Sequence, residues 1–374
     1  MPPRPRPSAA RTLAAATALV PALAAAQHGL SAAAADAYDP AVPTPRAVLG
    51  YDLGDRFTPH HLLTRYVERV AAASPRVRVD TLGHTAEGRE VLLVAVTSEP
   101  RAARLAEARG PVFDRLGHSV HGNEASGVEA GLAMLYQLAA GRDAETRAIL
   151  DSAVVLLDPS QNPDGHERHA QDVARARGAF GVPSAPAALA QQGAWPGARG
   201  SHYYFDLNRD WFIQSHPETR ARVAGFLSWM PHVAVDVHEM GSNSSYFFAP
   251  PMEPVNRNVP ADVRKWWDVF AAANAAAFDR AGWAYFRREG YDEFYPGYGV
   301  SWPILTGATG MTFEQASSGA GAIRRTDGAT MTLREAARHH YAAEWATTLA
   351  AARRAAVRVR DYAAARAKSE AKRS

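Results

Sequence analysis

Short apolar runs alternate with longer helical patterns along this chain, and no other feature restricts its fold as strongly. Residues 90–96 and 152–157 are almost entirely apolar, which is typical of strands buried on both faces. Apolar residues recur with helical spacing over residues 57–73, 127–140, 217–230 and 261–281. The alternation predicts an α/β fold, with a mixed, mostly parallel twisted sheet and helices on both faces.

Other segments have less regular patterns. Residues 101–109 are charged and helical, whereas 283–287 and 310–314 are predicted to form short strands. Residues 111–120 should form a strand but contain Asp, Arg and His, so this strand is expected to be weak and shortened. Residues 158–201 are rich in Pro and Gly and are predicted to form a long irregular loop, which in a compact domain is usually functional or disordered.

The N-terminus has the organisation of a secretory signal peptide. Residues 1–26 carry three arginines, followed by an apolar stretch that ends in three alanines and is too short to span a membrane as a mature helix. An alanine-rich disordered tail is the alternative interpretation. The pattern favours export, so we expect the mature protein to be secreted or periplasmic. We also expect it to have no membrane span, because no later run is long and apolar enough to cross a bilayer.

Composition and charge argue against several functions. The absence of cysteine among 374 residues excludes disulfides, zinc–thiolate sites and cysteine nucleophiles. The formal net charge is +3, but cleavage after Ala26 would remove three of the 41 basic residues and none of the 38 acidic ones, leaving 38 of each. A nearly neutral mature protein gives no reason to expect a nucleic acid partner.

A histidine and a glutamate three residues apart, His121 and Glu124, can reach one cation if a strand ends at the histidine and a helix opens at the glutamate. A catalytic zinc site usually takes three protein ligands plus water. His238 ends an apolar run, and sites in such sheets gather at the carboxyl ends of the strands, so we expect it to be the third ligand. One alternative is a structural role for His238. Another is the second His-x-x-Glu pair, His84 and Glu87, which we interpret as a turn between strands.

Two further motifs could act at such a site. Asn208 and Arg209 could bind a carboxylate of a substrate, because a planar guanidinium binds both oxygens. Asp206 lies two residues before Asn208, where a carboxylate could hold a ligand histidine. Glu314 ends a predicted short strand, where a general base could face metal-activated water. A surface salt bridge and an ordinary strand-end glutamate are the alternative interpretations.

Taken together, these motifs resemble the zinc carboxypeptidase family of metallopeptidases. The matching stretches occur in family order, at family-like spacing, at residues 120–124, 162–165, 206–211, 235–238 and 312–314. Further segments are similar to a bacterial, exported branch of the family, at residues 195–197, 202–211, 236–241 and 291–299. The resemblance implies a catalytic domain at residues 51–330, preceded by a linker at 27–50 and followed by an Ala/Arg-rich helical tail at 331–374.

The resemblance also implies a cofactor and a set of catalytic residues. One Zn²⁺ per chain would be held by His121, Glu124 and His238. Asp206 would orient the first ligand histidine, and Glu314 would act as the general base and then as the acid. The implied reaction is hydrolysis of a peptide bond in which zinc lowers the pKa of a water molecule.

Substrate-binding residues are implied in the same way. Asn208 and Arg209 would bind the free C-terminal carboxylate of the peptide. A tyrosine would cover the C-terminal residue, for which Tyr295 is favoured and Tyr298 is the second choice. The partner of the protein would therefore be a peptide with a free C-terminus.

An arginine that stabilises the oxyanion is expected between residues 162–165 and the Asn-Arg pair. Arg199 is favoured over Arg168 for this role, although the sequence around it departs from the family pattern. Asn123 stands where such peptidases often carry arginine. Both departures concern substrate contacts and leave the implied metal ligands unchanged.

The function that the sequence favours is an exported zinc metallocarboxypeptidase. One alternative is an amidohydrolase of the aspartoacylase type, which shares the His-x-x-Glu pair and the Asn-Arg motif and cleaves acylated amino acids. Residues 162–165 and 291–298 argue against it. A second alternative is a non-catalytic relative that binds zinc and peptide, and the presence of Glu314 argues against that interpretation.

Overall fold

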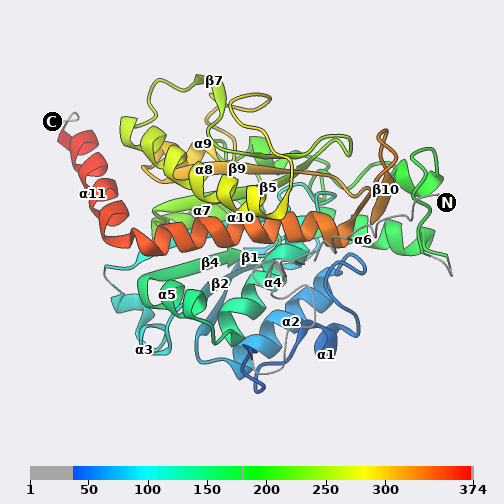
Figure 1. Ribbon diagram of the computed structural model, residues 1–374, viewed down its shortest axis with the longest axis horizontal. Coiled ribbons are helices and arrows are strands. Elements are labelled where there is room, and N and C mark those ends of the chain that lie inside the picture. The colour runs from blue at the N-terminus through cyan, green and yellow to red at the C-terminus, as the bar shows by residue number, and fades with distance from the viewer. Residues whose placement is uncertain (1–36, 109, 179–180, 372–374) are drawn as a thin grey trace, which may run out of the picture.

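The computed structural model describes residues 37–108, 110–178 and 181–371, and it is organised around a seven-stranded sheet (Figure 1). The strand order is β1-β2-β4-β3-β5-β9-β6; the four middle strands are parallel and the flanking pairs are antiparallel. The predicted mixed α/β architecture is therefore confirmed. The strands are β1 (Val77–His84), β2 (Glu90–Val96), β3 (Val112–His118), β4 (Ala153–Asp158), β5 (Val233–Met240), β6 (Tyr246–Phe248) and β9 (Thr309–Ala316).

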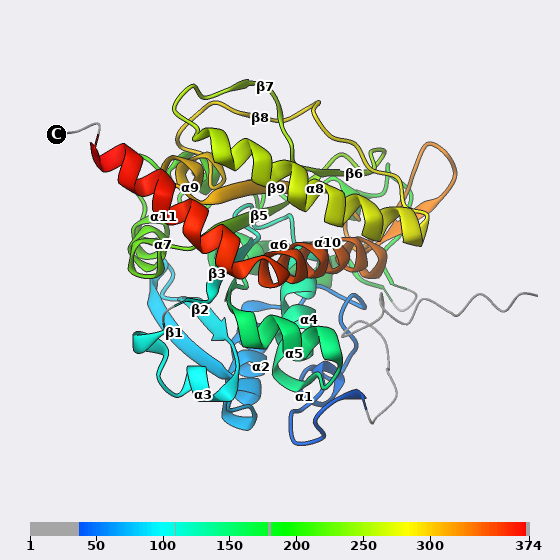
Figure 2. The same cartoon turned by 60° about the vertical axis from the view of Figure 1, so that its left-hand side comes forward.

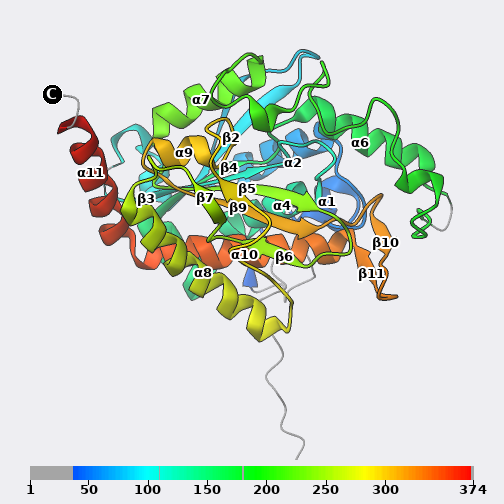
Figure 3. The same cartoon turned by 90° about the horizontal axis from the view of Figure 1, so that it is seen from above.

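Helices cover both faces of this sheet, with α7 on the side opposite α10 (Figure 3). Two small sheets lie outside it, formed by β7 (Met252–Val255) with β8 (Asp292–Glu293) and by β10 (Ala322–Arg324) with β11 (Thr330–Thr332). None of the helices within the described ranges is long and apolar enough to cross a bilayer. The helices are α1 (Pro45–Leu49), α2 (His60–Ala73), α3 (Glu99–Ala102), α4 (Ser126–Ala140), α5 (Ala144–Ser152), α6 (Pro163–Ala176), α7 (Pro217–Trp229), α8 (Ala261–Ala281), α9 (Ser301–Leu305), α10 (Leu333–Arg353) and α11 (Ala355–Ala371).

The two faces of the sheet pack into separate hydrophobic clusters. Alternate residues of β2 such as Leu92 and Val94 join the large cluster that α2, α4, α8 and α10 complete. The residues between them, Leu93 and Ala95, pack on the other side against a cluster that includes Trp229 at the end of α7. Successive side chains of a strand point to opposite faces, so a strand covered on both sides has to be apolar throughout. The prediction for residues 90–96 is confirmed.

The C-terminal segment packs into the same core rather than extending from it as a tail. α10 runs across the sheet, and α11 continues from it at an angle (Figures 1 and 2). Tyr341 and Ala343 of α10 are buried in the large cluster. In α11, Arg358 is buried and donates to the carbonyl of His232 at 2.7 Å and to that of Gly307 at 3.1 Å. Arg358 therefore fixes α11 beside the residues that precede β5 and β9.

The segment predicted as a weak strand is a complete central strand. β3 spans seven residues, and its polar side chains are buried with partners from distant elements. Asp114 accepts a hydrogen bond from Thr348 of α10 at 2.7 Å, and Arg115 pairs with Asp158 of β4 at 2.7 Å. These hydrogen-bonding partners offset the cost of burying polar side chains. β3 is as long as β2 and longer than β4, so the prediction of a weak, shortened strand was wrong.

Three other expectations differ from the structure. The stretch 158–201 is not a continuous loop, because Asn162 caps α6 by accepting from the N–H of Gly165 at 3.0 Å. Residues 283–287 contribute only a single bridge, between Phe286 and Phe247. The helix predicted at residues 101–109 is interrupted: among the described residues 101–108, only the end of α3 and a short 3₁₀ turn at Leu105–Glu107 are helical.

The predicted signal peptide, residues 1–26, and the first part of the predicted linker lie outside the described residues. The remainder of the linker, residues 37–50, is packed against the domain. Tyr38, Val42 and Leu49 are buried in the large cluster, and the N–H of Asp39 donates to the carbonyl of Ala140 at 2.8 Å. This segment is therefore part of the folded domain.

Candidate metal centre

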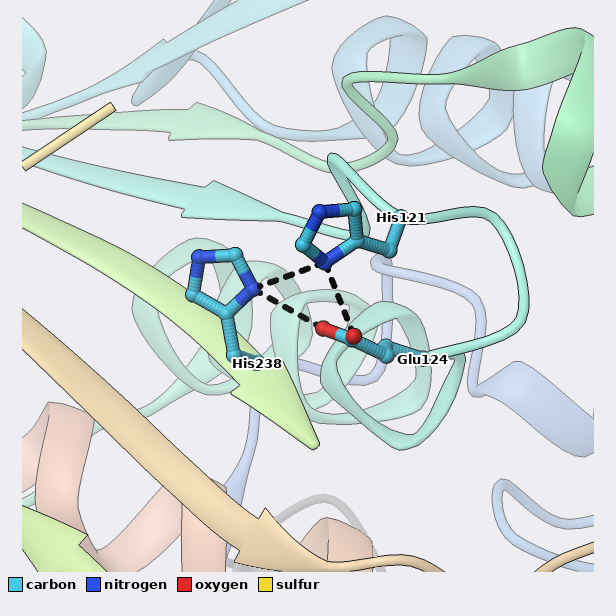
Figure 4. Close-up of side chains that lie close together, drawn as sticks. All are labelled: His121, Glu124 and His238. Carbon is cyan, nitrogen blue, oxygen red and sulfur yellow. Dashed lines mark hydrogen bonds and ion pairs between the residues drawn. The ribbon is translucent and has the colours of Figure 1, made fainter. Parts of the chain in front are cut away.

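Three buried side chains meet at the carboxyl ends of β3 and β5 (Figure 4). His121 Nδ1 lies 2.8 Å from Glu124 Oε1, and His238 Nδ1 lies 2.8 Å from Glu124 Oε2. The two Nδ1 atoms are 3.2 Å apart. Each residue offers one ligand atom, and these three atoms lie within 4.8 Å of one another. The structure thus brings together the three residues that the sequence predicts as metal ligands.

The short connection between β3 and α4 presents two of these ligands. Beyond the end of β3, Ser119 turns the chain with a φ of +53°, and its hydroxyl donates to the carbonyl of His121 at 3.0 Å. Gly122 packs so closely on the next segment that a Cβ atom there would lie 2.1 Å from the carbonyl carbon of Gly165. The N–H of Glu124 donates to the carbonyl of His121 at 3.0 Å. These contacts fix both side chains before α4 begins.

A carboxylate lies behind each histidine. Asp206 Oδ1 is 2.9 Å from His121 Nε2, and Asp236 Oδ2 is 2.9 Å from His238 Nε2. Such contacts hold the proton of a neutral imidazole on Nε2 and leave the lone pair of Nδ1 free for a metal. The sequence predicts the role of Asp206 but not that of Asp236. The signal for Asp236 was its place two residues before His238, because such residues share one face of a strand.

The charges around the centre suit a divalent cation. Burial alone would raise the pKa of Glu124, but His121 and His238 hold that pKa well below its usual range. Burial likewise opposes ionisation of Asp206 and Asp236, and their histidine partners lower the pKa of each carboxyl. The ionised form of all three carboxyls is therefore favoured, and negative charge in this place attracts a cation. Two imidazole nitrogens and one carboxylate oxygen are the donors of several catalytic zinc sites, so this group fits zinc.

Of the two candidate arginines, Arg199 reaches this centre. Its Nη1 lies 3.0 Å from Glu124 Oε1, and its Nη2 lies 3.2 Å from Asp206 Oδ2. About half of the Arg199 side chain, 49%, stays exposed. Arg168 instead donates to the carbonyl of Gly197 at 2.8 Å, so it holds the loop that carries Arg199.

The Asn-Arg pair and one of the predicted tyrosines form part of the same cavity. Asn208 Oδ1 accepts a hydrogen bond from the N–H of Gly299 at 2.7 Å, which fixes the amide. The guanidinium of Arg209 lies over the ring of Tyr298, 4.8 Å from its centroid. Tyr298 lines the cavity, whereas Tyr295 donates its hydroxyl to the carbonyl of Arg209 and does not line it. The structure therefore favours the second choice over the first.

Glu314 faces the centre from the neighbouring strand. It pairs with His238 in the parallel register of β5 and β9 and is 8% exposed. Burial, together with the nearby carboxylates of Glu124 and Asp236, raises the pKa of Glu314 above its usual range. Glu314 and the three predicted ligands line a cavity of about 320 Å³. Tyr291, for which the sequence predicts no individual role, also lines this cavity, and burial and Glu314 raise its pKa.

His84 of the second His-x-x-Glu pair belongs to no group of possible ligands within the described residues; Glu87 instead lies with Asp164 and His202, with ligand atoms within 4.8 Å of one another. Thr85 N–H donates to the carbonyl of Arg89 at 2.9 Å, so the residues after His84 form a turn between β1 and β2, as predicted. Glu87 approaches a buried aspartate, Asp164, but the Nη1 of Arg89 lies 2.5 Å from the former and 2.7 Å from the latter. The Arg89 guanidinium thus pairs with both carboxylates of this group.

Comparison with known proteins identifies a family. The model of the family described as zinc carboxypeptidase matches residues 63–277. Carboxypeptidase D of Homo sapiens is 28% identical over 183 residues, which make up 46% of this chain and only 12% of that protein. The metallo-carboxypeptidase of Burkholderia cenocepacia has a TM-score of 0.55 at 16% identity, covering 77% of this chain and 67% of its own. That of Pseudomonas aeruginosa has a TM-score of 0.55 at 17% identity, covering 81% and 69%. These structures agree with the fold described above.

Proposed function

The chain belongs to the zinc carboxypeptidase family, and we propose from this that it is a zinc-dependent metallocarboxypeptidase. Its reaction is the hydrolysis of peptide bonds near a free C-terminal carboxylate. The observation that carries the proposal is the buried group His121, Glu124 and His238, which lines one cavity together with Glu314. The matched part of the human relative is a small share of that protein, so the activity is inferred from the site rather than from the relative.

His121, Glu124 and His238 would hold one Zn²⁺, and Glu314 moves protons beside them. Zinc, when bound, supplies Lewis-acid catalysis to the hydrolysis. Glu314 accepts a proton from the attacking water and delivers it to the leaving amine. The burial that raises its pKa suits a base that works near neutral pH. Asp206 and Asp236 keep the ligand histidines in the required tautomer and orientation.

Three further side chains act on the substrate. Arg199 has the exposed guanidinium nearest to the metal centre and stabilises the oxyanion that forms on the scissile carbonyl. Arg209 binds the C-terminal carboxylate through both oxygens, and Asn208 adds an amide donor. Tyr298 supports the guanidinium of Arg209 from below through its ring.

Product analysis tests this function. Peptides with a free C-terminus should lose residues one at a time from that end, and the same peptides with an amidated C-terminus should be poor substrates. A chelator should stop the reaction, and added zinc should restore it. Equal cleavage of free and amidated peptides would overturn the proposal. Cleavage of N-acyl amino acids alone would indicate an amidohydrolase, and zinc binding without turnover of either substrate would indicate a binding protein.

We also propose that the protein is exported, so that it acts in a secreted or periplasmic location. Residues 1–26 support this proposal through their arginines and the apolar stretch that follows them. N-terminal sequencing of protein recovered outside the cytoplasm should give a chain that begins at Gln27. Recovery of an uncut chain from the cytoplasm alone would contradict export without bearing on the catalytic proposal.

A further inference from the structure

Arg199 lies on a segment without regular secondary structure. Residues 192–206 contain no helix or strand, so the hydrogen bonds of such elements do not fix the position of this segment. The guanidinium of Arg199 nevertheless reaches Glu124 and Asp206 at the metal centre, at 3.0 and 3.2 Å. What it can reach depends on where the backbone of the segment lies, so contacts from outside the segment must place this arginine.

Arg168 holds this segment on both sides of Arg199. From α6, its Nη1 donates to the carbonyl of Gly197 at 2.8 Å and its Nη2 donates to the carbonyl of Ser201 at 3.3 Å. One guanidinium can do this because its N–H groups form a planar fork, so two of them can bind two different acceptors. The side chain thus bridges the two ends of residues 197–201 and restrains the backbone around Arg199.

The contacts of the Arg168 guanidinium all lead to this segment. Within the described ranges no carboxylate pairs with it, and both of its hydrogen bonds end on residues 197–201. The ring of Tyr204, on the same segment, stacks with it at 5.1 Å from the ring centroid. A hydrogen bond from a charged donor is stronger than one between neutral groups. The positive charge of Arg168 is therefore used to hold the segment and not to form an ion pair.

Two other donors to the segment also belong to the surroundings of the metal ligands. The carbonyl of Arg199 accepts from the N–H of Gly122 at 3.4 Å and from Nδ2 of Asn162 at 3.2 Å. The same amide of Asn162 donates to the carbonyl of Val120 at 3.3 Å, and Val120 and Gly122 flank the first ligand histidine. Arg168 makes no hydrogen bond to that connection among the described residues, so its replacement tests the hold on Arg199 separately from the metal ligands.

We propose that Arg168 is a positioning residue for the hydrolysis, which places the guanidinium of Arg199 beside the metal centre by holding residues 197–201. This inference rests on the proposed carboxypeptidase function, in which Arg199 stabilises the oxyanion. A donor to an oxyanion is most effective when it is fixed in advance, because it then needs no reorganisation during the reaction. A misplacement of about 1 Å can cost about 10²-fold in rate. Without Arg168, kcat should therefore fall while KM stays nearly constant.

A double-mutant cycle tests whether Arg168 acts through Arg199. On a peptide with a free C-terminus, Arg168→Gln should lower kcat by about 10- to 100-fold and change KM by less than about twofold. Arg199→Gln should lower kcat by about 10²–10³-fold, as expected for the loss of one donor to the oxyanion. When Arg199 is already glutamine, Arg168→Gln should lower kcat by less than about a further twofold, because the group that it positions is gone.

Limited proteolysis gives a second measurement, which does not depend on activity. Trypsin should cleave after Arg199 at least about fivefold faster in Arg168→Gln than in wild type, because proteases cut segments that open locally. Arg175→Gln is the matched control: Arg175 also lies on α6, but its side chain is 74% exposed and pairs with Asp172. The control should leave kcat, KM and the rate of cleavage after Arg199 unchanged.

Several outcomes would overturn the proposal. Losses that multiply in the double variant would show that Arg168 acts independently of Arg199, and an unchanged kcat or a loss confined to KM would show that it positions nothing for the reaction. Zinc content should match that of wild type, and loss of zinc from Arg168→Gln would assign the residue to the metal site instead.

Arg168→Lys repeats the cycle if the glutamine variant does not fold, because it keeps the charge and loses only the planar fork. It should lower kcat by about three- to tenfold, and again only when Arg199 is present. A loss of the same size without Arg199 would contradict the proposal. A wild type that removes no residue from the C-terminus would refute the proposed function and this inference with it, whereas every other outcome leaves that function standing.

Discussion

Replacing Asp236 by asparagine should weaken metal binding although it preserves the size of the side chain. Asp236 accepts two hydrogen bonds, from Gln161 Nε2 to Oδ1 at 2.9 Å and from His238 Nε2 to Oδ2 at 2.9 Å. An amide can accept at one end only. If its oxygen keeps Gln161, its NH₂ group faces His238 and donates to Nε2. The imidazole proton then moves to Nδ1, where it blocks the metal.

The opposite orientation of the amide is no better. Its oxygen would then face His238, but its NH₂ group would oppose the NH₂ group of Gln161 in a site that is only 1% exposed at position 236. An unsatisfied buried donor costs about 1–3 kcal/mol. Loss of the carboxylate behind a ligand histidine typically costs about 10–100-fold in metal affinity, which is about 1.4–2.7 kcal/mol. In either orientation of the amide, we therefore expect zinc to bind more weakly, by about 1–3 kcal/mol.

Zinc affinity is measured by titrating metal-free protein in competition with a chromophoric chelator. Asp164→Asn is the matched control, because Asp164 is also 1% exposed and contacts Thr85 and Arg89 but none of the proposed ligands. It should reduce stability and leave zinc affinity unchanged. An Asp236→Asn variant that binds zinc within about threefold of wild type would refute the argument that this carboxylate sets the tautomer of His238.

Three further outcomes are expected. Glu314→Gln should lower kcat by about 10²–10⁴ with zinc content retained, and loss of zinc instead would make Glu314 a ligand. His238→Ala should lose most of the zinc, whereas His84→Ala should keep it; equal losses by metal analysis would contradict our choice between the two motifs. Burial raises the pKa of Asp114 to about 7, so the folded state loses stability as pH rises toward that value. In denaturant titrations at about pH 5 and about pH 8, wild type should therefore lose about 3 kcal/mol more than Asp114→Asn between the two conditions.

The sequence predicts the metal ligands because each follows a pattern that is local. An apolar run ends at His238, and a short strand ends at Glu314; in the structure these two residues are paired in adjacent parallel strands. His121 and Glu124 are separated by a single turn of backbone. The sheet then brings the three strand ends to one edge, as the alternation of strands and helices requires. A residue that ends one of these strands therefore lies in the site.

The substrate side is less predictable for a physical reason. Residues 289–300 contain several tyrosines, and their spacing does not say which one points into the cavity. Tyr295 is turned away because its hydroxyl bonds to the backbone of Arg209, while Tyr298 stacks under the guanidinium of the same residue. That choice depends on contacts between two irregular segments 86 residues apart. Neither the spacing of apolar residues nor helix or strand propensity tells which tyrosine points into the cavity.

The strand that leads to His121 depends on the last part of the chain. β3 has a buried polar side chain near each end, and both are met by α10: Asp114 by Thr348 at 2.7 Å, and His118 by Glu344 at 3.3 Å. Leaving a buried polar group without its partner costs about 1–3 kcal/mol, so packing of α10 stabilises β3 in this place. The composition of β3 indicates a weak strand because its partners lie more than two hundred residues away. α10, which the sequence places in a C-terminal tail, thus helps to hold the strand that leads to the metal ligand His121.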